Sequence, residues 1–322
     1  MHELGPEPNF NESMYFNLYD PASGLGGFFR LGNRANEGTG EMTICLYLPD
    51  GRVGFMFGRP KVTTNDAFDA GGMQFEVVTP FEELTVRYEG SVVLLDDPLQ
   101  MADPRHAFTN NPHTQAAVDL VYRGVAPMFG GEPDERNERP GEEFARGHYE
   151  QLVSGSGEIS VGEEAFDVSG FGLRDHSWGP RYWQAPWYYR WLTANVGPDF
   201  GFMGSRVARR DGPGGRGGFV WDGTELVACS DFRIHSRWEG EASYHRGIEA
   251  ELVSGERTWK VKGEVLNLIP LRNRRTDPSG AELVTRISEG MTRWTLEDGR
   301  VGYGLSEYLD QIVDGAPVGL AE

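Results

Sequence analysis

The sequence is poor in cysteine and histidine and has no long apolar run, and each shortage excludes a class of protein. Only Cys45 and Cys229 occur among 322 residues, neither in a CxxC pattern, which excludes a disulfide framework and a thiolate metal site. The seven histidines show no HxH or HExxH spacing, so no metal is expected. No stretch approaches the roughly 18 apolar residues of a membrane-spanning helix. Since a signal-peptide pattern is also missing, we expect a cytoplasmic protein.

Basic residues are scarce relative to acidic ones. The chain has 30 Lys and Arg against 49 Asp and Glu, a formal charge of -19. This charge would repel a phosphate backbone or an anionic membrane, which argues against nucleic-acid binding and against stable membrane insertion. A hydrophobic fraction of 39% is enough for a substantial core, which excludes a disordered chain.

Glycine and aromatic residues are abundant, with 44 Gly, 18 Phe, 12 Tyr and 8 Trp. Helical periodicity is rare, whereas apolar residues alternate over the stretch 42–48, a pattern typical of strands. Turn pairs such as Asp222-Gly223 and Asp298-Gly299 follow or precede such stretches. The sequence therefore predicts an all-β protein of antiparallel hairpins.

Short segments of the chain repeat in the same order. Three pairs match, at 32–34 and 204–206, at 84–94 and 257–267, and at 170–176 and 302–308. Fewer residues separate the two members of the third pair than separate the members of the first two pairs. The first copy therefore has extra residues before its third segment, which predicts a charged loop or lid inserted at about 96–146. We expect two tandem domains, 1–184 and 185–322, with chance similarity among Gly-rich strands as the alternative.

Antiparallel domains of this size must protect their edge strands. Closure into a lipocalin-like β-barrel does so and leaves an interior that can hold one apolar ligand. A two-sheet sandwich would show the same strand pattern, so it stays open as the alternative.

The segment 170–191 contains seven Trp or Tyr residues beside Asp175 and His176. On a strand, Asp175 shares a face with Ser177, and His176 shares the other face with Trp178, so the two form no direct dyad. Burial in an aromatic cavity would raise the pKa of Asp175 and make it a proton donor. A structural salt bridge from Asp175 to an arginine is the alternative.

The DHSWG motif at Asp175–Gly179, followed by Arg181, resembles the carotenoid 1,2-hydratase (hydroxyneurosporene synthase) and AttH-like superfamily, whose members have tandem lipocalin-like domains. The resemblance covers most of the chain and is closest to an uncharacterised bacterial branch. Supporting segments lie at 15–20, 32–38, 75–81, 148–151 and 302–308.

The resemblance implies cofactor-independent chemistry on an unsaturated hydrophobic molecule, with Asp175 as the suspected acid. We expect a hydratase or dehydratase acting on a terpenoid, steroid or polyketide-like substrate, since the chain has no apolar segment for a membrane-bound carotenoid. An isomerase or cyclase on the same substrates and a non-catalytic carrier stay open, as does a homodimer.

In the catalytic hypothesis, Asp175 protonates an alkene, aromatic faces stabilise the cation, and His176 or Tyr149 holds the attacking water. Glu307 matches Asp175 in the second copy. The expected catalytic residues are Asp175, His176 and Tyr149, and the expected substrate-binding residues are Trp178, Tyr182, Trp183, Trp187, Tyr189, Asn36, Glu37 and Glu307.

Overall fold

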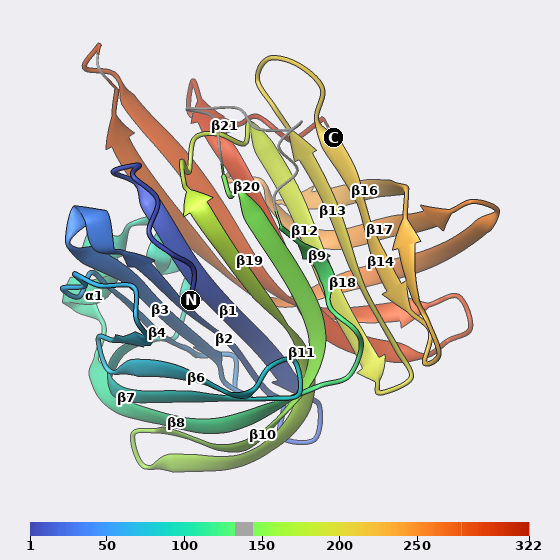
Figure 1. Cartoon of the computed structure of the whole chain (residues 1–322), viewed down its shortest axis with the longest axis horizontal. Coiled ribbons are helices and arrows are strands. Elements are labelled where there is room, and N and C mark those ends of the chain that lie inside the picture. The colour runs from blue at the N-terminus through green and yellow to red at the C-terminus, as the bar shows by residue number, and fades with distance from the viewer. Residues whose placement is uncertain (133–143, 278, 322) are drawn as a thin grey trace. The chain divides into compact units, whose positions relative to one another are not determined.

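The computed structural model describes residues 1–132, 144–277 and 279–321. The chain divides into two compact units, Met1–Asp97 with Ala107–Tyr182, and Pro98–His106 with Trp183–Glu322. One large antiparallel sheet forms each unit, coloured blue to green in the first and yellow-green to red in the second (Figure 1). The prediction of an all-β chain with two tandem antiparallel barrel-like domains is confirmed.

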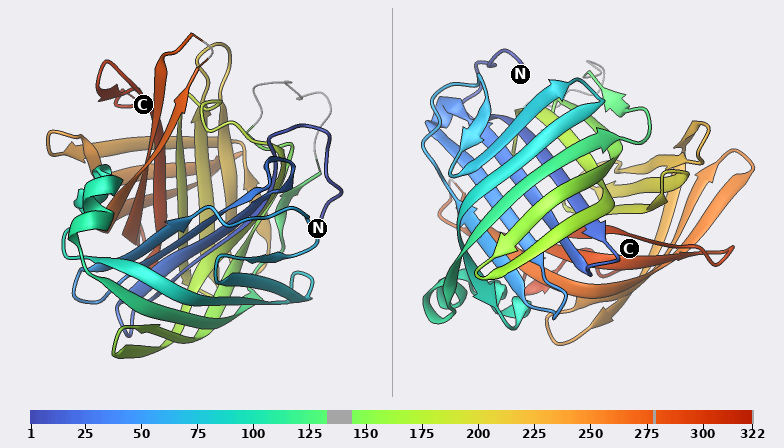
Figure 2. Two further views of the ribbon diagram at one scale, coloured as in Figure 1. Left: turned by 90° about the vertical axis from the view of Figure 1, so that its left-hand side faces the viewer. Right: turned by 90° about the horizontal axis from the view of Figure 1, so that it is seen from below.

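The first sheet closes into a ring. Its strands are β1 (Phe10–Asp20), β2 (Leu25–Arg34), β3 (Thr39–Tyr47), β4 (Val53–Gly58), β5 (Phe68–Ala70), β6 (Met73–Thr79), β7 (Glu83–Leu95), β8 (His113–Gly124), β9 (Phe129–Gly131), β10 (Gly147–Val161) and β11 (Glu164–Pro180). They follow the order β4-β3-β2-β1-β11-β10-β8-β7-β6-β5, and β4 also pairs with β7. Eight strands therefore form a barrel without free edges, and the right-hand view of Figure 2 shows these strands curling round.

The second sheet has the same strand order around its centre. Its strands are β12 (Tyr188–Gly197), β13 (Phe200–Ala208), β14 (Gly215–Trp221), β15 (Leu226–Cys229), β16 (Asp231–Glu239), β17 (Tyr244–Ser254), β18 (Arg257–Thr276), β19 (Glu282–Leu296), β20 (Val301–Val313) and β21 (Ala316–Pro317). The order is β15-β14-β13-β12-β20-β19-β18-β17-β16. As in the first unit, the first strand of the unit pairs with its last long strand.

Glycines allow that central pairing in both units. A Cβ atom on Gly172 of β11 would lie 1.8 Å from the backbone oxygen of Asn17 in β1, and one on Gly304 of β20 would lie 2.1 Å from that of Thr193 in β12. Neither approach is compatible with a side chain. The repeated Gly-aromatic-Gly-Leu pattern therefore has a packing cause, which is the close contact of the two central strands.

Two of the three sequence repeats lie in equivalent strands, and the third does not. Gly32 and Gly204 lie in β2 and β13, and Gly170 and Gly302 begin the matched motifs of β11 and β20. The match between 84–94 and 257–267 is wrong, because β7 is the fourth neighbour from β1 whereas β18 is the third from β12. The two segments look alike because each contains a glycine that faces an aromatic ring. This local feature can occur in strands that hold different places in the sheet.

The expected insertion at 96–146 is two insertions on either side of a sheet strand. Residues 113–124 form β8, which pairs with both β7 and β10. Before it lie the 3-10 helix η2 (Pro98–Ala102) and the helix α1 (Pro104–Asn110). After it comes β9, and residues 133–143 of the predicted charged loop lie outside the described part. Among the described residues, no helix is long and apolar enough to cross a membrane.

Each unit has its own hydrophobic core. In the first, the predicted alternation of β3 is confirmed, since Met42, Ile44 and Leu46 point into the barrel. The opposite face of β3 is also buried, which the sequence pattern did not indicate. Large side chains such as Phe16 and Phe29 lie in the interior of the first barrel and pack in its core.

The second unit has a buried ion pair between its central strands. Arg190 of β12 makes two 3.1 Å contacts to Asp310 of β20, and its guanidinium lies 4.5 Å from the centre of the Tyr308 ring. The same guanidinium donates to the backbone oxygen of Gly319, so the pair also anchors the C-terminal segment. Both charged side chains are fully buried, so the charge of each is compensated by the charge of the other.

We expect the Asp310→Asn variant to lose about 3 to 5 kcal/mol of stability, because the Arg190 charge would then be buried opposite a neutral amide. Urea unfolding measured by tryptophan fluorescence checks the loss. Asp298→Asn is the control, since the Asp298 pair with Arg300 is exposed. Equal unfolding midpoints for the two variants would contradict the role of the buried pair.

Candidate functional site

Strand β11 carries the DHSWG motif and directs Asp175 and His176 to opposite faces of the first sheet. His176 pairs with Met14 across the β1–β11 ladder, and Met14 belongs to the barrel core. Asp175 pairs with Tyr15 and therefore points to the outer face. Asp175 and His176 form no dyad, as the alternation along a strand predicts.

His176 lies in a polar cluster at one end of the barrel interior. Its Nε2 atom lies 2.9 Å from Glu12 Oε1, and its Nδ1 atom lies 3.0 Å from the Tyr149 hydroxyl. Burial lowers the pKa of His176, although the hydrogen bond to Glu12 opposes this effect. A neutral His176 donates from Nε2 to the carboxylate and accepts from the Tyr149 hydroxyl at Nδ1.

Glu12 of β1 is fully buried and ionised. Burial alone would raise its pKa, but hydrogen bonds from His176, Asn65 and His2 lower the pKa to about 2. His2 contributes its ring Nδ1 at 2.9 Å and its backbone N–H at 2.8 Å. Sequence analysis missed Glu12, although an acid that interrupts the apolar alternation of a predicted strand was a usable signal.

Trp178, an expected substrate-binding residue, is buried within this inner cluster. Its ring stacks on His2 with a centroid distance of 3.8 Å and meets His176 edge-on at 5.5 Å. The Tyr149 ring lies 5.0 Å from the Arg174 guanidinium and 6.1 Å from Trp178. These rings cover one another, so Trp178 is already packed on neighbouring side chains.

The outer face carries a second cluster, centred on Asp175. His148 of β10 places Nε2 2.8 Å from Asp175 Oδ2 and 3.6 Å from Glu150 Oε1. Burial would lower the pKa of His148, but the two carboxylates raise it to about 9. The His148 side chain is 41% exposed and that of Asp175 22%, so this pair can be reached by a small molecule.

Asp175 is therefore ionised, which corrects the expectation of a protonated acid. Burial would raise its pKa, but His148 and Arg181 together lower it. The alternative was a salt bridge from Asp175 to an arginine. The side chain that is hydrogen-bonded to Asp175 is instead a histidine on the neighbouring strand. His148 was missed as a site residue since only the β10–β11 register brings it beside Asp175.

Arginines extend the outer cluster. Arg181 donates from Nη2 to Ser177 Oγ at 2.7 Å, and burial together with the charge of Arg30 lowers its pKa to about 10. Arg30 in turn pairs with Glu41 at 3.1 Å. The outer face around Asp175 thus holds several buried charges of both signs.

The trio of catalytic residues expected from the sequence is divided between the two faces. His176 and Tyr149 lie inside the barrel, whereas Asp175 lies outside. The sheet itself separates them, so a water held by His176 or Tyr149 cannot attack a substrate protonated at Asp175. That combination of roles is wrong, because adjacent residues of a strand alternate between faces.

The polar run after β2 has a structural role. Asn36 and Glu37 lie in the 3-10 helix η1 (Ala35–Glu37). The Asn36 amide donates to the backbone oxygens of Gly5 and Glu7 at 2.9 Å, and Glu37 accepts two hydrogen bonds from Arg34. The expected substrate contacts of Asn36 and Glu37 remain predictions.

The other expected binding residues lie near the end of the first unit or in the second. Tyr182 follows β11 and is half-buried. In the second unit, Gln311 donates to the backbone oxygen of Trp183 at 3.1 Å, and Arg210 lies 5.2 Å from the centre of the Trp187 ring. Their roles toward a substrate are not tested by these contacts.

Tyr189 and Glu307 are brought together in the second unit. The Tyr189 hydroxyl donates to Glu307 Oε1. Glu307 lies opposite Trp191 on β12, as Asp175 lies opposite Tyr15 on β1. This agreement places Glu307 and Asp175 at equivalent positions of the two sheets.

Glu289 of β19 is a carboxyl group that sequence analysis missed. It pairs with Glu307, as Glu150 pairs with Asp175 in the first unit. Ile287 stands two residues before Glu289, where His148 stands before Glu150, so the second sheet has an apolar side chain at the position of the imidazole. Burial raises the pKa of Glu289 to about 8. The second sheet therefore holds a protonated carboxyl group at neutral pH.

We expect the Glu289→Gln variant to gain stability relative to the wild type as the pH rises from 5 to 8. Unfolded chains release the Glu289 proton above about pH 4.5 while the folded chain retains it to about 8, so folding loses stability across that window. At 1.36 kcal/mol per pKa unit, the difference reaches about 4 kcal/mol at pH 8.

Urea unfolding at several pH values measures this difference. Glu264→Gln, at an exposed position of β18, is the control and should show no such trend. A constant difference between Glu289→Gln and the wild type at every pH would show that Glu289 is ionised in the folded protein.

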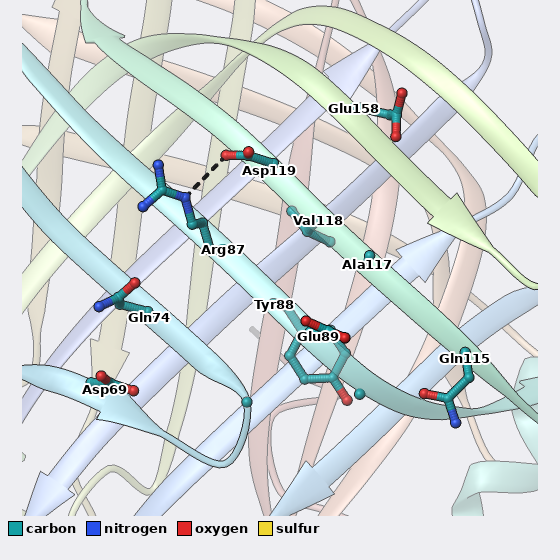
Figure 3. A pocket seen from close by; sticks show the side chains of 12 residues that line it. Asp69, Gln74, Arg87, Tyr88, Glu89, Gln115, Ala117, Val118, Asp119 and Glu158 are labelled. Atoms are coloured by element: carbon teal, nitrogen blue, oxygen red, sulfur yellow. Dashed lines mark hydrogen bonds and ion pairs between the residues drawn. The ribbon is translucent and has the colours of Figure 1, made fainter.

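A shallow depression lies on the outside of the first barrel, away from both clusters. It measures about 710 Å³ and is lined by residues of β5 to β8 and β10, among them Arg87, Asp119 and Glu158. Figure 3 shows these polar side chains standing on the strands, with Arg87 paired to Asp119 at 3.3 Å. Its lining includes none of the residues expected from the sequence to act on a substrate.

Solved structures with the same fold support the resemblance seen in the sequence. A putative AttH from Nitrosomonas europaea is 15% identical with a TM-score of 0.62, covering 96% of this chain and 93% of its own. Kievitone hydratase from Nectria haematococca is 11% identical with a TM-score of 0.58, covering 93% and 88%. CghA with Sch210972 is 11% identical with a TM-score of 0.57, covering 94% and 88%.

These similarities define the chain as a protein with the tandem antiparallel barrel-like fold of the AttH-like and hydratase structures, so the resemblance is confirmed at the level of the fold. Residues 1–312 match one family model, and the chain belongs to that family, described as "Domain of unknown function (DUF7064)". No curated protein matches the sequence.

Proposed function

We propose that the protein is a cofactor-independent enzyme of hydratase or lyase type that acts on an alkene of a hydrophobic small molecule. The observation that carries this proposal is the 2.8 Å pair of His148 and Asp175 at a partly exposed position of the DHSWG strand. A charged imidazole held by a carboxylate is a proton donor near neutral pH. The name of kievitone hydratase, which has the same fold, supports the reaction class.

In this proposal the proton donor is His148, and Asp175 positions it and maintains its charge. An imidazolium with a pKa of about 9 is too weak an acid to protonate an isolated alkene, whose conjugate carbocation is extremely acidic. The pair suits a substrate in which negative charge develops on oxygen, such as an alkene conjugated to a carbonyl group. We therefore favour a conjugated ketone or ester over an isolated double bond.

The proposed steps balance in both directions. In hydration, the oxygen of water bonds to the β-carbon, and the His148 proton passes to the enolate that forms. The proton released by the added water returns to His148 through solvent or through the nearby carboxylate of Glu150. In dehydration the same steps run in reverse. Neutral His148 removes the proton from the α-carbon, and the hydroxyl group leaves the enolate as water with a proton supplied by solvent or through Glu150. Isomerisation or cyclisation of the same substrates would use the same donor.

A non-catalytic carrier of a hydrophobic ligand is the alternative, and the His148→Gln variant separates the two functions. We expect this variant to retain ligand affinity and to lose turnover by about 10² to 10⁴-fold, the usual contribution of a general acid. The probes are unsaturated ketones with apolar rings and their β-hydroxy counterparts, incubated in D₂O. Mass spectrometry then follows the gain or loss of one water and the incorporation of carbon-bound deuterium.

His235→Gln is the matched control, because His235 is exposed on β16. Turnover that is equal in His148→Gln and the wild type would remove His148 from the donor role. Binding of the probes without turnover by the wild type would support the carrier.

The pH profile tests the pair directly. Because hydration needs protonated His148, kcat/KM for hydration should fall as the pH rises through its pKa of about 9. In Asp175→Asn the main cause of the raised pKa is lost, so the same decline should move toward acid by about two units. A decline that stays at the same pH in Asp175→Asn would show that another group is titrating.

A further inference from the structure

The inner cluster of the first barrel brings together ligands that no spacing in the sequence indicates. His2 Nδ1, Glu12 Oε1 and His176 Nε2 all lie within 4.8 Å of one another. We propose that His2, Glu12 and His176 bind one divalent transition-metal ion, with Zn²⁺ as the ion that their donor atoms suit best. This site lies on the opposite face of β11 from Asp175, and it is independent of the proposed enzymatic function.

The distances between the three proposed ligand atoms are close to those of a tetrahedral zinc site. Both imidazole nitrogens lie 2.9 Å from Glu12 Oε1. With Zn–N and Zn–O bonds of about 2.1 Å, a tetrahedral site needs ligand atoms about 3.4 Å apart. The two distances between Oε1 and nitrogen would lengthen by about half an ångström, and the two nitrogens already lie within 4.8 Å of each other. Two imidazoles and a carboxylate leave a fourth position for water.

Groups around the three ligands fix their orientation. The Tyr149 oxygen lies 3.0 Å from His176 Nδ1, so it can accept a hydrogen bond from Nδ1–H when Nε2 binds the metal. Asn65 donates to Glu12 Oε2, and the backbone N–H of His2 donates to the same oxygen at 2.8 Å and to Oε1 at a longer 3.1 Å, so the carboxylate is held with Oε1 toward the two imidazoles. The Trp178 ring stacks on His2 and holds its imidazole plane. Such second partners are typical of ligands in metal sites.

The segment before β1, the N-terminal arm, is held by hydrogen bonds so that His2 reaches the cluster. Asn65 donates to the backbone oxygen of His2 at 2.9 Å, and the Asn36 amide binds the backbone oxygens of Gly5 and Glu7. The arm is therefore positioned without the metal. The His2 side chain is 32% exposed, which gives an ion access to an otherwise buried carboxylate.

A second cluster, formed by His148, Glu150 and Asp175 on the outer face, has similar spacing. Its one imidazole lies 2.8 Å from Asp175 Oδ2 and 3.6 Å from Glu150 Oε1, so this cluster offers two carboxylates and a single nitrogen, whereas the inner cluster offers two nitrogens and one carboxylate. The donor set with two imidazoles suits Zn²⁺ better. This difference makes His148 the control for the test.

The test is Co²⁺ titration of the untagged, chelator-treated protein, followed by the visible absorption of the bound ion and by displacement with Zn²⁺. We expect one ion per chain, with affinity lowered at least tenfold in His2→Ala and in Glu12→Gln and unchanged in His148→Ala. His2→Ala lies on the arm rather than in the barrel, so the fold is preserved. Circular dichroism verifies this for each variant.

Two results would overturn the proposal. One is the absence of stoichiometric Co²⁺ binding by the folded wild type. The other is binding lost in His2→Ala but retained in Glu12→Gln, which would place the ion on His2 without the Glu12 carboxylate. As an independent measurement, Zn²⁺ should raise the Tm of the wild type and of His148→Ala but not that of His2→Ala.

Discussion

The pairing of β1 with β11 is the constraint on which the first unit depends. It joins the first strand of the unit to its last, and Gly170 and Gly172 allow the two backbones to approach closely. Together with the β4–β7 ladder it closes the eight-stranded barrel, since the other ladders of the ring join strands that lie near one another in sequence. The β12–β20 pair has the same place in the second unit, with the same glycine pattern.

That pairing also decides which side chains meet. Because strands alternate, the β1–β11 and β10–β11 registers place His176 with Glu12 and Tyr149 inside, and Asp175 with His148 outside. One sheet thus carries two histidine–carboxylate clusters that differ in charge. Two carboxylates hold a proton on His148, whereas burial keeps His176 neutral. The outer cluster suits proton transfer, and the inner one suits a metal ion.

Comparison of the two units shows how one framework holds different chemistry. Glu150 and Asp175 correspond to Glu289 and Glu307 by register. In the first unit, an imidazolium compensates the carboxylates. In the second, Ile287 stands in the place of His148, and burial raises the pKa of Glu289 to about 8. The two units share the order of their central strands and the glycines between them, whereas the ionisation of the carboxyl groups depends on single neighbouring residues.

The sequence by itself determined the strands, the antiparallel class, the tandem arrangement and the division of Asp175 from His176, because alternation, turns and glycines are local properties. It did not determine the order of β7 and β8, the ionised state of Asp175, or the partnership of His2, Glu12 and His176. Those depend on register between strands far apart in the chain and on burial. Only the tertiary structure fixes these distances, and with them the pKa values and ligand sets on which the proposed chemistry rests.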